Sequence, residues 1–179
     1  DFTKKLYNKF DSHCPYPGLA RQVKEKYHHL EGMLEGNPAP DISLVNASEE
    51  SKKLSDYRGK YLYIDCWATW CGPCIAEFPS LKSLEQEYKG KNITFISISF
   101  DDRKDNEKWK KFIKDRNLSG IQVKVDSLNK ERLSKAFNIQ QIPRFILLDP
   151  RGNIMNANAP KPSDKKIKSV FDGLIGEKT

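Results

Sequence analysis

The chain has 179 residues, of which 37% are hydrophobic, and it contains 10 glycines and 10 prolines. This length and composition fit one globular domain with a modest extension, and they exclude an intrinsically disordered chain. The formal net charge of +7 comes from lysines scattered among 24 acidic residues, and no apolar stretch approaches the roughly 18 residues of a membrane span, so we expect neither a nucleic-acid partner nor a transmembrane segment in this chain.

The N-terminal part of the chain has the pattern of two short helices. Apolar residues recur at helical spacing over residues 1–10 and 19–34, and prolines between the two segments break the helix. An extended linker is expected at 36–40, because each proline there disfavours helix in the residue before it. We therefore expect residues 1–36 to be a helical extension, which could be the tail of a missing upstream domain, and residues 37–179 to form the main domain.

The rest of the chain alternates between strand-like and helix-like segments and closes with a hairpin. Segments 61–67 and 93–100 are apolar on both faces, as central strands are, whereas 121–125 alternates like a strand with one face in water. This order predicts an α/β sandwich with a central mixed β-sheet flanked by helices. The other expected elements are a hairpin edge around 42–54, strands at 145–148 and 154–157, and helices at 71–89 with a kink at Pro79, around Trp109 with Asp105 as its cap, around Leu133, and at 165–175.

The feature with the clearest chemistry is Trp70-Cys71-Gly72-Pro73-Cys74, placed where a buried strand gives way to a helix. A helix N-terminus offers unpaired N–H groups and the positive end of the helix dipole, which stabilise a thiolate at Cys71. Cys74 lies one turn into the helix, where it reaches Cys71 but is shielded from solvent. This asymmetry predicts that Cys71 attacks a substrate disulfide and that Cys74 resolves the mixed disulfide.

Several neighbours of the pair are candidate substrate-binding residues. Gly72 and Pro73 fit the turn between the cysteines, because proline suits a first helical turn, and Trp70 is a candidate for packing against the substrate. Far along the chain, Ile142-Pro143 follows a helix and leads directly into a strand. A proline there indicates a tight turn and a candidate cis peptide bond.

Together these residues resemble the thioredoxin superfamily, and the chain is more similar still to the exported TlpA/ResA-type thiol–disulfide oxidoreductases. The second resemblance covers about residues 36–175. The resemblance to the superfamily rests on Asp65, Trp67, Ala68, the Cys71–Cys74 motif with Trp70, Pro79 and Ile142-Pro143. The resemblance to the TlpA/ResA-type enzymes rests on the opening at 36–41, Tyr57-Arg58-Gly59-Lys60, Glu77-Phe78-Pro79, and the Trp109 helix after Ser99-Phe100-Asp101.

The resemblance implies disulfide exchange with protein or small-thiol substrates through Cys71 and Cys74, with no cofactor. Its Gly-Pro spacer is similar to that of reducing members, which implies a reductase, supplied by an upstream thiol electron donor and acting on client proteins with disulfides or thiols. The implied location is the periplasm or another extracytoplasmic compartment. The chain begins at Asp1 without an initiator Met, so we expect a mature form or a fragment whose export signal or membrane anchor has been lost.

The resemblance also implies roles around the pair. Pro143 would be the cis-proline facing the cysteines, Glu77 an active-site glutamate, and Asp65 the buried acid beneath the resolving thiol. Burial should raise the pKa of Asp65 towards neutrality and let it accept that thiol's proton; the alternatives are a satisfied structural acid at Asp65 and a surface acid at Glu77. Arg144 stands where thioredoxins usually carry threonine, and its charge could favour the attacking thiolate. Cys66, on the other strand face from Asp65, is expected to be a core residue.

Four other functions compete for a Cys-x-x-Cys pair. Zinc needs two further ligands, and the remote candidates are Cys14, His28 and His29. Haem attachment needs a histidine after the second cysteine, where Ile75 stands. A thiol peroxidase of the thiol-specific antioxidant class would resemble a sequence with threonine three residues before its reactive cysteine, where Ala68 stands before Cys71. A non-catalytic binding module of the same fold would not need an intact dithiol, so disulfide exchange is favoured.

Overall fold

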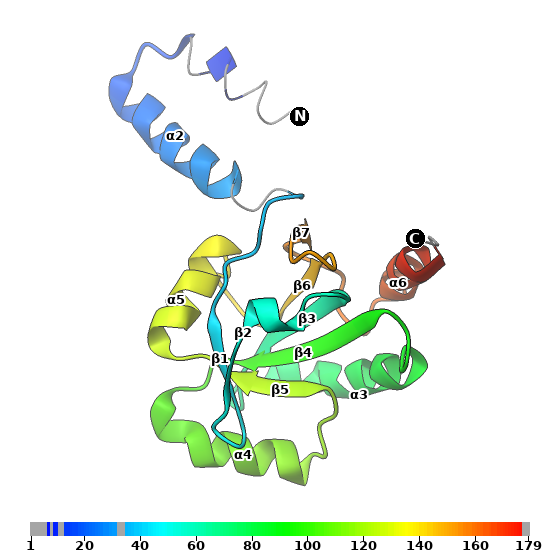
Figure 1. Ribbon diagram of the computed structural model, residues 1–179. Coiled ribbons are helices and arrows are strands. Elements are labelled where there is room, and N and C mark those ends of the chain that lie inside the picture. The colour runs from blue at the N-terminus through cyan, green and yellow to red at the C-terminus, as the bar shows by residue number, and fades with distance from the viewer. Residues whose placement is uncertain (1–6, 8, 11–12, 32–34, 177–179) are drawn as a thin grey trace.

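A computed structural model describes residues 7, 9–10, 13–31 and 35–176, and it is built on one seven-stranded mixed sheet. The strands are β1 (Ser43–Asn46), β2 (Ser51–Lys53), β3 (Tyr61–Trp67), β4 (Ile93–Ser99), β5 (Ile121–Lys124), β6 (Arg144–Leu148) and β7 (Ile154–Asn156). Their order is β2-β1-β5-β4-β3-β6-β7 (Figure 1). β3, β4 and β5 are parallel, whereas β1, β6 and β7 pair antiparallel to their neighbours. The predicted mixed sheet is confirmed.

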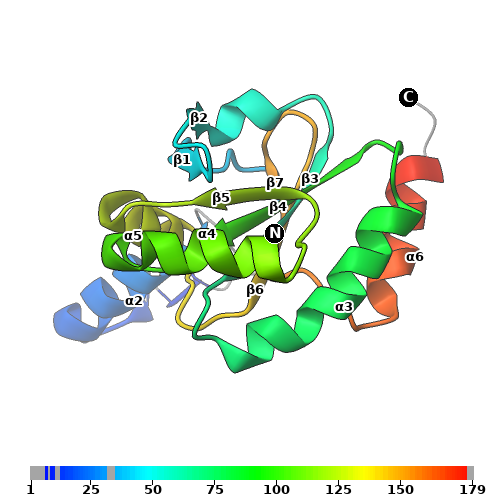
Figure 2. The ribbon, with the colours of Figure 1, turned by 90° about the horizontal axis from the view of Figure 1, so that it is seen from below.

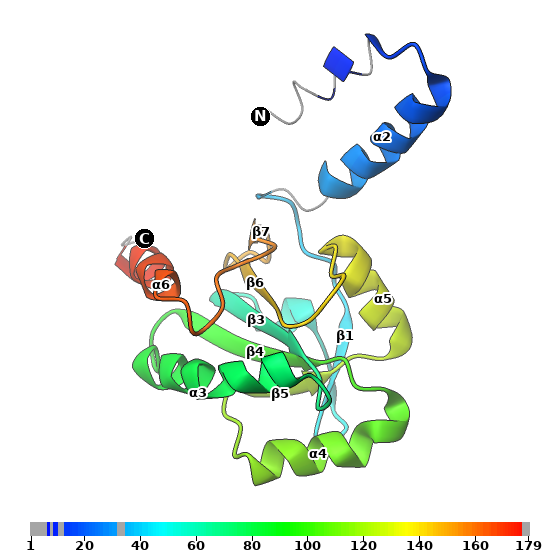
Figure 3. The ribbon, with the colours of Figure 1, turned by 180° about the vertical axis from the view of Figure 1, so that it is seen from behind.

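Helices cover both faces of this sheet. They are α3 (Gly72–Glu87), α4 (Asn106–Asp115), α5 (Ser127–Ala136) and α6 (Lys166–Gly176), with 3-10 turns η1 (Leu54–Tyr57) and η2 (Arg103–Asp105). The N-terminal helix α2 (Pro17–Glu31) lies beyond the sheet (Figure 1). α3 and α6 lie side by side on one face, where the rings of Tyr88 and Phe171 are 5.1 Å apart (Figure 2). Figure 3 shows α5 and α6 on opposite sides of β3 and β6. The guanidinium of Arg144 donates to the carbonyl of Asn138, just after α5.

Aromatic rings form the core between β3 and the α3–α6 layer. Tyr63 is fully buried, stacks on Phe145 at 5.7 Å, and meets the edges of Phe95 and Phe171 at 5.8 and 5.2 Å. Its hydroxyl donates to the carbonyl of Pro160 at 2.7 Å, so the polar end of the ring is satisfied. Burial raises the pKa of this hydroxyl far above its usual range. β3 is therefore the central strand that the apolar run at 61–67 predicts.

We expect Phe171→Ala to lower the free energy of unfolding by about 3–5 kcal/mol. Phe171 is fully buried among three other rings, so truncation leaves a cavity that the packed core cannot fill. Urea unfolding of the oxidised protein measures the change. Leu128→Ala is the matched control, because Leu128 is 66% exposed and its truncation should stay within about 0.5 kcal/mol. Equal effects of the two substitutions would contradict this account of the core.

The segment before β1 runs along the outer side of β7. Gly36 N–H donates to the carbonyl of Ile154 at 2.8 Å, and Ile154 N–H donates to the carbonyl of Asn37 at 2.7 Å. Pro38 continues the pairing as an antiparallel bridge to Asn153. The predicted extended conformation is confirmed from Pro38 onwards, whereas Gly36 lies in a turn with φ +91°. The division into an extension and a main domain at 36/37 stays a prediction.

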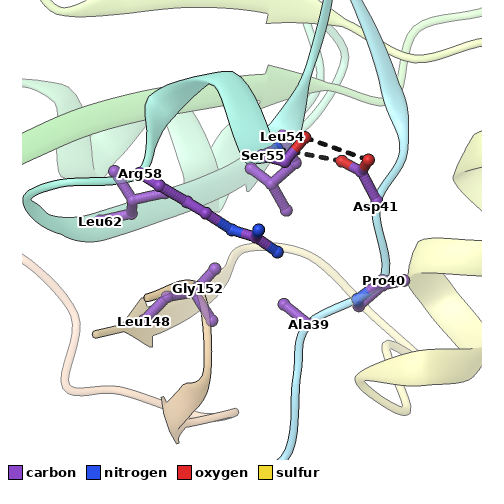
Figure 4. A pocket seen from close by; sticks show the side chains of 9 residues that line it. All are labelled: Ala39, Pro40, Asp41, Leu54, Ser55, Arg58, Leu62, Leu148 and Gly152. Atoms are coloured by element: carbon purple, nitrogen blue, oxygen red, sulfur yellow. Dashed lines mark hydrogen bonds between the residues drawn. The ribbon is translucent and has the colours of Figure 1, made fainter. Parts of the chain in front are cut away.

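A small cavity next to this segment shows why one turn needs glycine. The side chain of Arg58 reaches across Gly152 towards Ala39 (Figure 4). Gly152 has φ +87°, and a Cβ on it would lie 2.8 Å from Nε of Arg58. The left-handed backbone therefore favours glycine at the β6–β7 turn, and a side chain there would also push Arg58 aside. On the same cavity wall, Asp41 accepts hydrogen bonds from the backbone N–H and the hydroxyl of Ser55, each 3.0 Å long.

Two local expectations after β4 are wrong. The strand at 121–125 has no fully wet face: Lys124 is only 8% exposed, and its Nζ donates to the carbonyl of Asp102 at 2.7 Å. The contact comes from the loop after β4, whose carbonyl at Asp102 takes the place of water at the Lys124 ammonium group. Asp105 stands at the N-cap of α4 but makes no side-chain cap bond. Its backbone continues the turn η2 with φ −95° and ψ 16°, outside the extended region that a capping side chain needs.

The N-terminal helix α2 begins at Pro17, inside the stretch expected to break the helix. Proline suits this place because the first helical N–H needs no partner within the helix. Tyr27 of α2 is buried, and its ring stacks on that of Tyr7 at 3.9 Å. Most of the helix predicted over 1–10 lies outside the described residues. Within the part of the chain that is described, no helix has the length and apolar character needed to span a bilayer.

Candidate active site

The two motif cysteines lie at the junction of β3 and α3. Cys71 is the N-cap of α3, and Pro73 lies in the first helical turn. The backbone N–H of Cys74 donates to Sγ of Cys71 at 3.2 Å, so a helix N-terminal donor points at this sulfur. The sulfurs form a disulfide of 1.99 Å, with the Cα atoms 5.3 Å apart. The helix terminus therefore favours negative charge on Cys71 once the disulfide is reduced.

Exposure differs along the motif in the predicted order. Cys74 is 1% exposed and Cys71 is 4% exposed, so the second cysteine is shielded and the first is only slightly more accessible in the disulfide form. Trp70 is 63% exposed. This ring lies in water directly beside the pair, so its apolar faces and its N–H are available for contact with a substrate.

The proline that precedes β6 has a cis peptide bond, as predicted for Ile142-Pro143. Arg144 follows as the first residue of β6 and pairs with Cys66 of β3. Its guanidinium donates to the carbonyls of Ala157 and Asn138, both at 3.4 Å. The positive charge of Arg144 lowers the pKa of the Cys66 thiol, but burial has the larger effect and raises it. An effect of Arg144 on the Cys71 thiol stays a prediction.

Asp65 of β3 carries a buried carboxyl group. It is 3% exposed, and none of the described residues donates a hydrogen bond to it. Burial is the main cause that raises the pKa of Asp65 to about 8, and the negative charges of Glu85 and Glu77 add to the shift. The predicted rise towards neutrality is confirmed. The group can therefore exchange a proton near physiological pH.

Glu77 is a buried acid held by a distant part of the chain. It is 8% exposed, and its carboxylate accepts hydrogen bonds from the backbone N–H and the hydroxyl of Ser163, each 2.9 Å long. Nζ of Lys161 lies 3.3 Å from the same carboxylate. The surface-acid alternative is wrong, because the 161–163 segment before α6 folds over Glu77. Sequence spacing along α3 could not reveal this long-range contact.

A further polar cluster beside the motif was not singled out from the sequence. Asp101, which follows β4, is 2% exposed and accepts hydrogen bonds from Thr69 and Ser99. The available signal was a Ser-x-Asp sequence at the end of a strand, together with a threonine two residues before Cys71. This signal is weak, because only the parallel pairing of β3 with β4 brings the two loops together.

Cys66 and Cys14 lie outside the redox motif. Cys66 is fully buried in the core, as predicted. Cys14 is a free, partly exposed cysteine whose Sγ lies 3.6 Å from the carbonyl of Tyr16. The side chains of His28 and His29 lie outside what the structure describes. No group of three or more His, Cys, Asp or Glu side chains suited to a metal ion occurs among the described residues.

Comparison with known proteins identifies the family of this site. The profile of the Redoxin family matches residues 34–174. The chain belongs to the Redoxin family. Thioredoxin-like protein YneN of Bacillus subtilis is 29% identical over 141 residues, which cover 79% of this chain and 81% of YneN. Thiol-disulfide oxidoreductase ResA of Geobacillus kaustophilus is 29% identical over 119 residues, which cover 66% of each chain.

A solved structure agrees with this Redoxin assignment. A protein of Bacteroides vulgatus, assigned as a thiol–disulfide oxidoreductase, superposes with a TM-score of 0.70 at 38% identity, over 79% of this chain and 96% of its own. The Redoxin chain described here is thus a thioredoxin-like oxidoreductase of the TlpA/ResA type. It exchanges thiols and disulfides, and the Cys71–Cys74 disulfide is its redox pair.

Proposed function

We propose that this enzyme is a reductase of protein disulfides in which Cys71 attacks, Cys74 resolves, Asp65 accepts a proton and Glu77 tunes the thiols. One observation carries the proposal. The sulfur of Cys71 accepts a helix N-terminal N–H at 3.2 Å, whereas Cys74 lies inside the helix and is 1% exposed. An anionic, more accessible thiol is suited to the first attack, and a shielded neighbour is suited to the second.

The reaction balances as two successive displacements. The Cys71 thiolate attacks one sulfur of a client disulfide, a mixed disulfide forms, and the other client sulfur leaves as a thiolate. Cys74 then gives its proton to the Asp65 carboxylate, directly or through a water, and attacks Sγ of Cys71. The second client thiolate leaves. The client disulfide has then been reduced by two electrons, and the Cys71–Cys74 pair has been oxidised to a disulfide. An upstream dithiol donor must reduce this disulfide before the next cycle.

The direction of electron flow can be tested by a redox titration of the pair against glutathione. The Gly72-Pro73 spacer supports a reductase, since it is similar to that of reducing members of the superfamily. We expect a midpoint nearer the value of about −270 mV found for thioredoxin than the value of about −120 mV found for DsbA. Tryptophan fluorescence or thiol labelling follows the transition. A midpoint near the DsbA value would show that the enzyme is an oxidant.

We expect Glu77→Gln to lower the pKa of the Cys71 thiol, because it removes a nearby negative charge that disfavours the thiolate. The pKa of Asp65 should fall as well, since the charge of Glu77 raises it. The rate of iodoacetamide alkylation between pH 5 and pH 9 measures the thiol titration. Glu87→Gln is the control, because Glu87 is a more exposed acid of the same helix, paired with Lys168. If both thiol titrations are unchanged in Glu77→Gln, Glu77 serves only to hold the 161–163 segment.

The proposed setting is extracytoplasmic, with attachment to a membrane through sequence upstream of this chain. Support comes from the similarity to exported TlpA/ResA-type enzymes. The proposed partners are client proteins with disulfides and an upstream thiol electron donor. Separation of cells into membrane, periplasmic and cytoplasmic fractions, with an antibody against this domain, tests the location.

A further inference from the structure

The loop that carries Trp70 and Cys71 is fastened to the end of β4 by one buried carboxylate. The backbone N–H of Thr69 donates to both oxygens of Asp101, at 3.0 and 3.2 Å, and Oγ1 of Thr69 donates to Oδ1 at 2.6 Å. Oγ of Ser99 donates to Oδ2 at 2.7 Å. Both carboxylate oxygens therefore accept hydrogen bonds from Thr69. Oδ2 also accepts the bond from Ser99, which is the last residue of β4.

Thr69 and the attacking Cys71 belong to the same hydrogen-bonded turn, so a restraint on Thr69 also restrains Cys71. The N–H of Cys71 donates to the carbonyl of Ala68 at 3.0 Å, which closes a turn over residues 68–71. The N–H of Phe100 donates to the carbonyl of Trp67 at 2.7 Å and anchors the start of this turn to β4. With both ends bonded and Thr69 clamped from the side, the turn has little freedom to move Cys71 relative to the helix.

We propose that Asp101 is a positioning residue of the disulfide exchange, which acts through Thr69 to hold Sγ of Cys71 at the N-cap of α3 and the Trp70 ring towards the client. The proposal rests on the function proposed for the cysteine pair, and it adds a residue to that function which touches neither cysteine. Its contribution is geometric: the thiolate keeps the helix N–H at 3.2 Å and faces an incoming disulfide in line with the resolving thiol.

Burial makes a carboxylate the suitable group for this clamp. Thr69 is 7% exposed and Asp101 is 2% exposed, so the donors of Thr69 have no ready access to water. Buried donors need acceptors, and a carboxylate offers acceptors on both oxygens. An asparagine would present an NH₂ group to one of the donors and leave that donor unpaired. Asp101→Asn should therefore loosen the turn although it preserves the shape of the side chain.

The test compares Thr69→Val with Thr69→Ser in the full, reduced chain. Valine keeps the volume of threonine but removes the Oγ1 donor, whereas serine restores it. We expect Thr69→Val to reduce a small aromatic disulfide about ten-fold more slowly. The pH profile of iodoacetamide alkylation at Cys71 should also move to higher pH, because the sulfur loses its fixed helix donor. Thr69→Ser should restore both the reduction rate and the pH profile. If the contact only stabilised the fold, none of these variants would change either property.

Two further variants keep the test decisive. Ser55→Ala removes the same kind of hydroxyl–carboxylate bond, here between Ser55 and Asp41 and outside the 68–71 turn, and it should leave both readouts at wild-type values. If Thr69→Val does not fold, Ser99→Ala removes only the bond behind Asp101, and we expect about a three-fold slower reaction. Wild-type rates and an unchanged pH profile in Thr69→Val or Ser99→Ala overturn the proposal. A wild-type enzyme that reduces no disulfide instead overturns the proposed function.

Discussion

Cys74→Ser should stop the enzyme at the mixed disulfide, with client molecules covalently attached to Cys71. The serine hydroxyl cannot displace the client thiol, so the complex should persist for hours while the wild type completes the exchange within seconds to minutes. Non-reducing electrophoresis and mass spectrometry of the adduct measure the trapped species and locate the bond. In the reduced wild type, alkylation at pH 6 should label Cys71 before Cys74.

Two other cysteine variants provide the comparison for this trap. Cys71→Ser should form no adduct, because the remaining thiol is shielded and lacks the N-cap position. Cys66→Ala should behave as the wild type, since Cys66 is fully buried in the core. Stable adducts through Cys74 in the Cys71→Ser variant, or faster labelling of Cys74, would reverse the two assignments.

Asp65→Asn should slow resolution of the mixed disulfide by about 10²-fold and leave the first attack nearly unchanged. The carboxyl has a pKa of about 8, and only its ionised form can accept the proton of Cys74. The wild-type resolution rate should therefore rise with pH until about 8, and the variant should lack this rise. Single-turnover mixing of a preformed mixed disulfide between pH 6 and pH 9 measures the step. Wild-type rates across this range would show that Asp65 is not the base.

The same substitution should also change stability in a direction set by the raised pKa. Because the folded-state pKa of Asp65 is above its unfolded value, folding favours the protonated form, and stability is lost as the pH rises from about 4 towards 8. Asp65→Asn removes this loss, so its free energy of unfolding should exceed that of the wild type by several kcal/mol at pH 9, on the scale of about 1.4 kcal/mol per pKa unit. Near pH 4 the two proteins should differ little. Parallel pH dependences would contradict the shift.

Local chemistry along the chain was enough to predict much of the fold and the redox pair. The apolar run of β3 and the Cys-Gly-Pro-Cys turn are short-range patterns, and each predicts its own structure from residue type and spacing. The core position of Cys66 followed in the same way, from strand alternation. The cis bond before Pro143 was implied by the resemblance to thioredoxins, with the proline at the entry to a strand as support. The roles assigned to Asp65, Glu77 and Arg144 stay predictions.

Contacts that depend on the order of strands in the sheet could not be predicted from the sequence. Lys124 looked solvent-exposed because its own strand alternates, yet its ammonium group bonds to the carbonyl of Asp102, in the loop after the neighbouring strand β4. For Glu77 the sequence left a surface acid open beside the active-site role, because the residues that cover it belong to a loop more than 80 positions later. Asp101 reaches Thr69 only because β3 and β4 are neighbours. Each miss concerns a polar side chain whose partner lies beyond the reach of local pattern.

The residues at the two open edges of the sheet affect how readily one molecule can pair with another. An open sheet edge can pair with the edge of another molecule, which is a common route to aggregates. At one edge, β2 carries two exposed lysines, Lys52 and Lys53, whose like charges repel a second copy. At the other, the segment around Pro38 and Pro40 lies along β7, and proline offers no N–H to an incoming strand. Both edges of the described sheet are therefore poorly suited to pairing with a second copy.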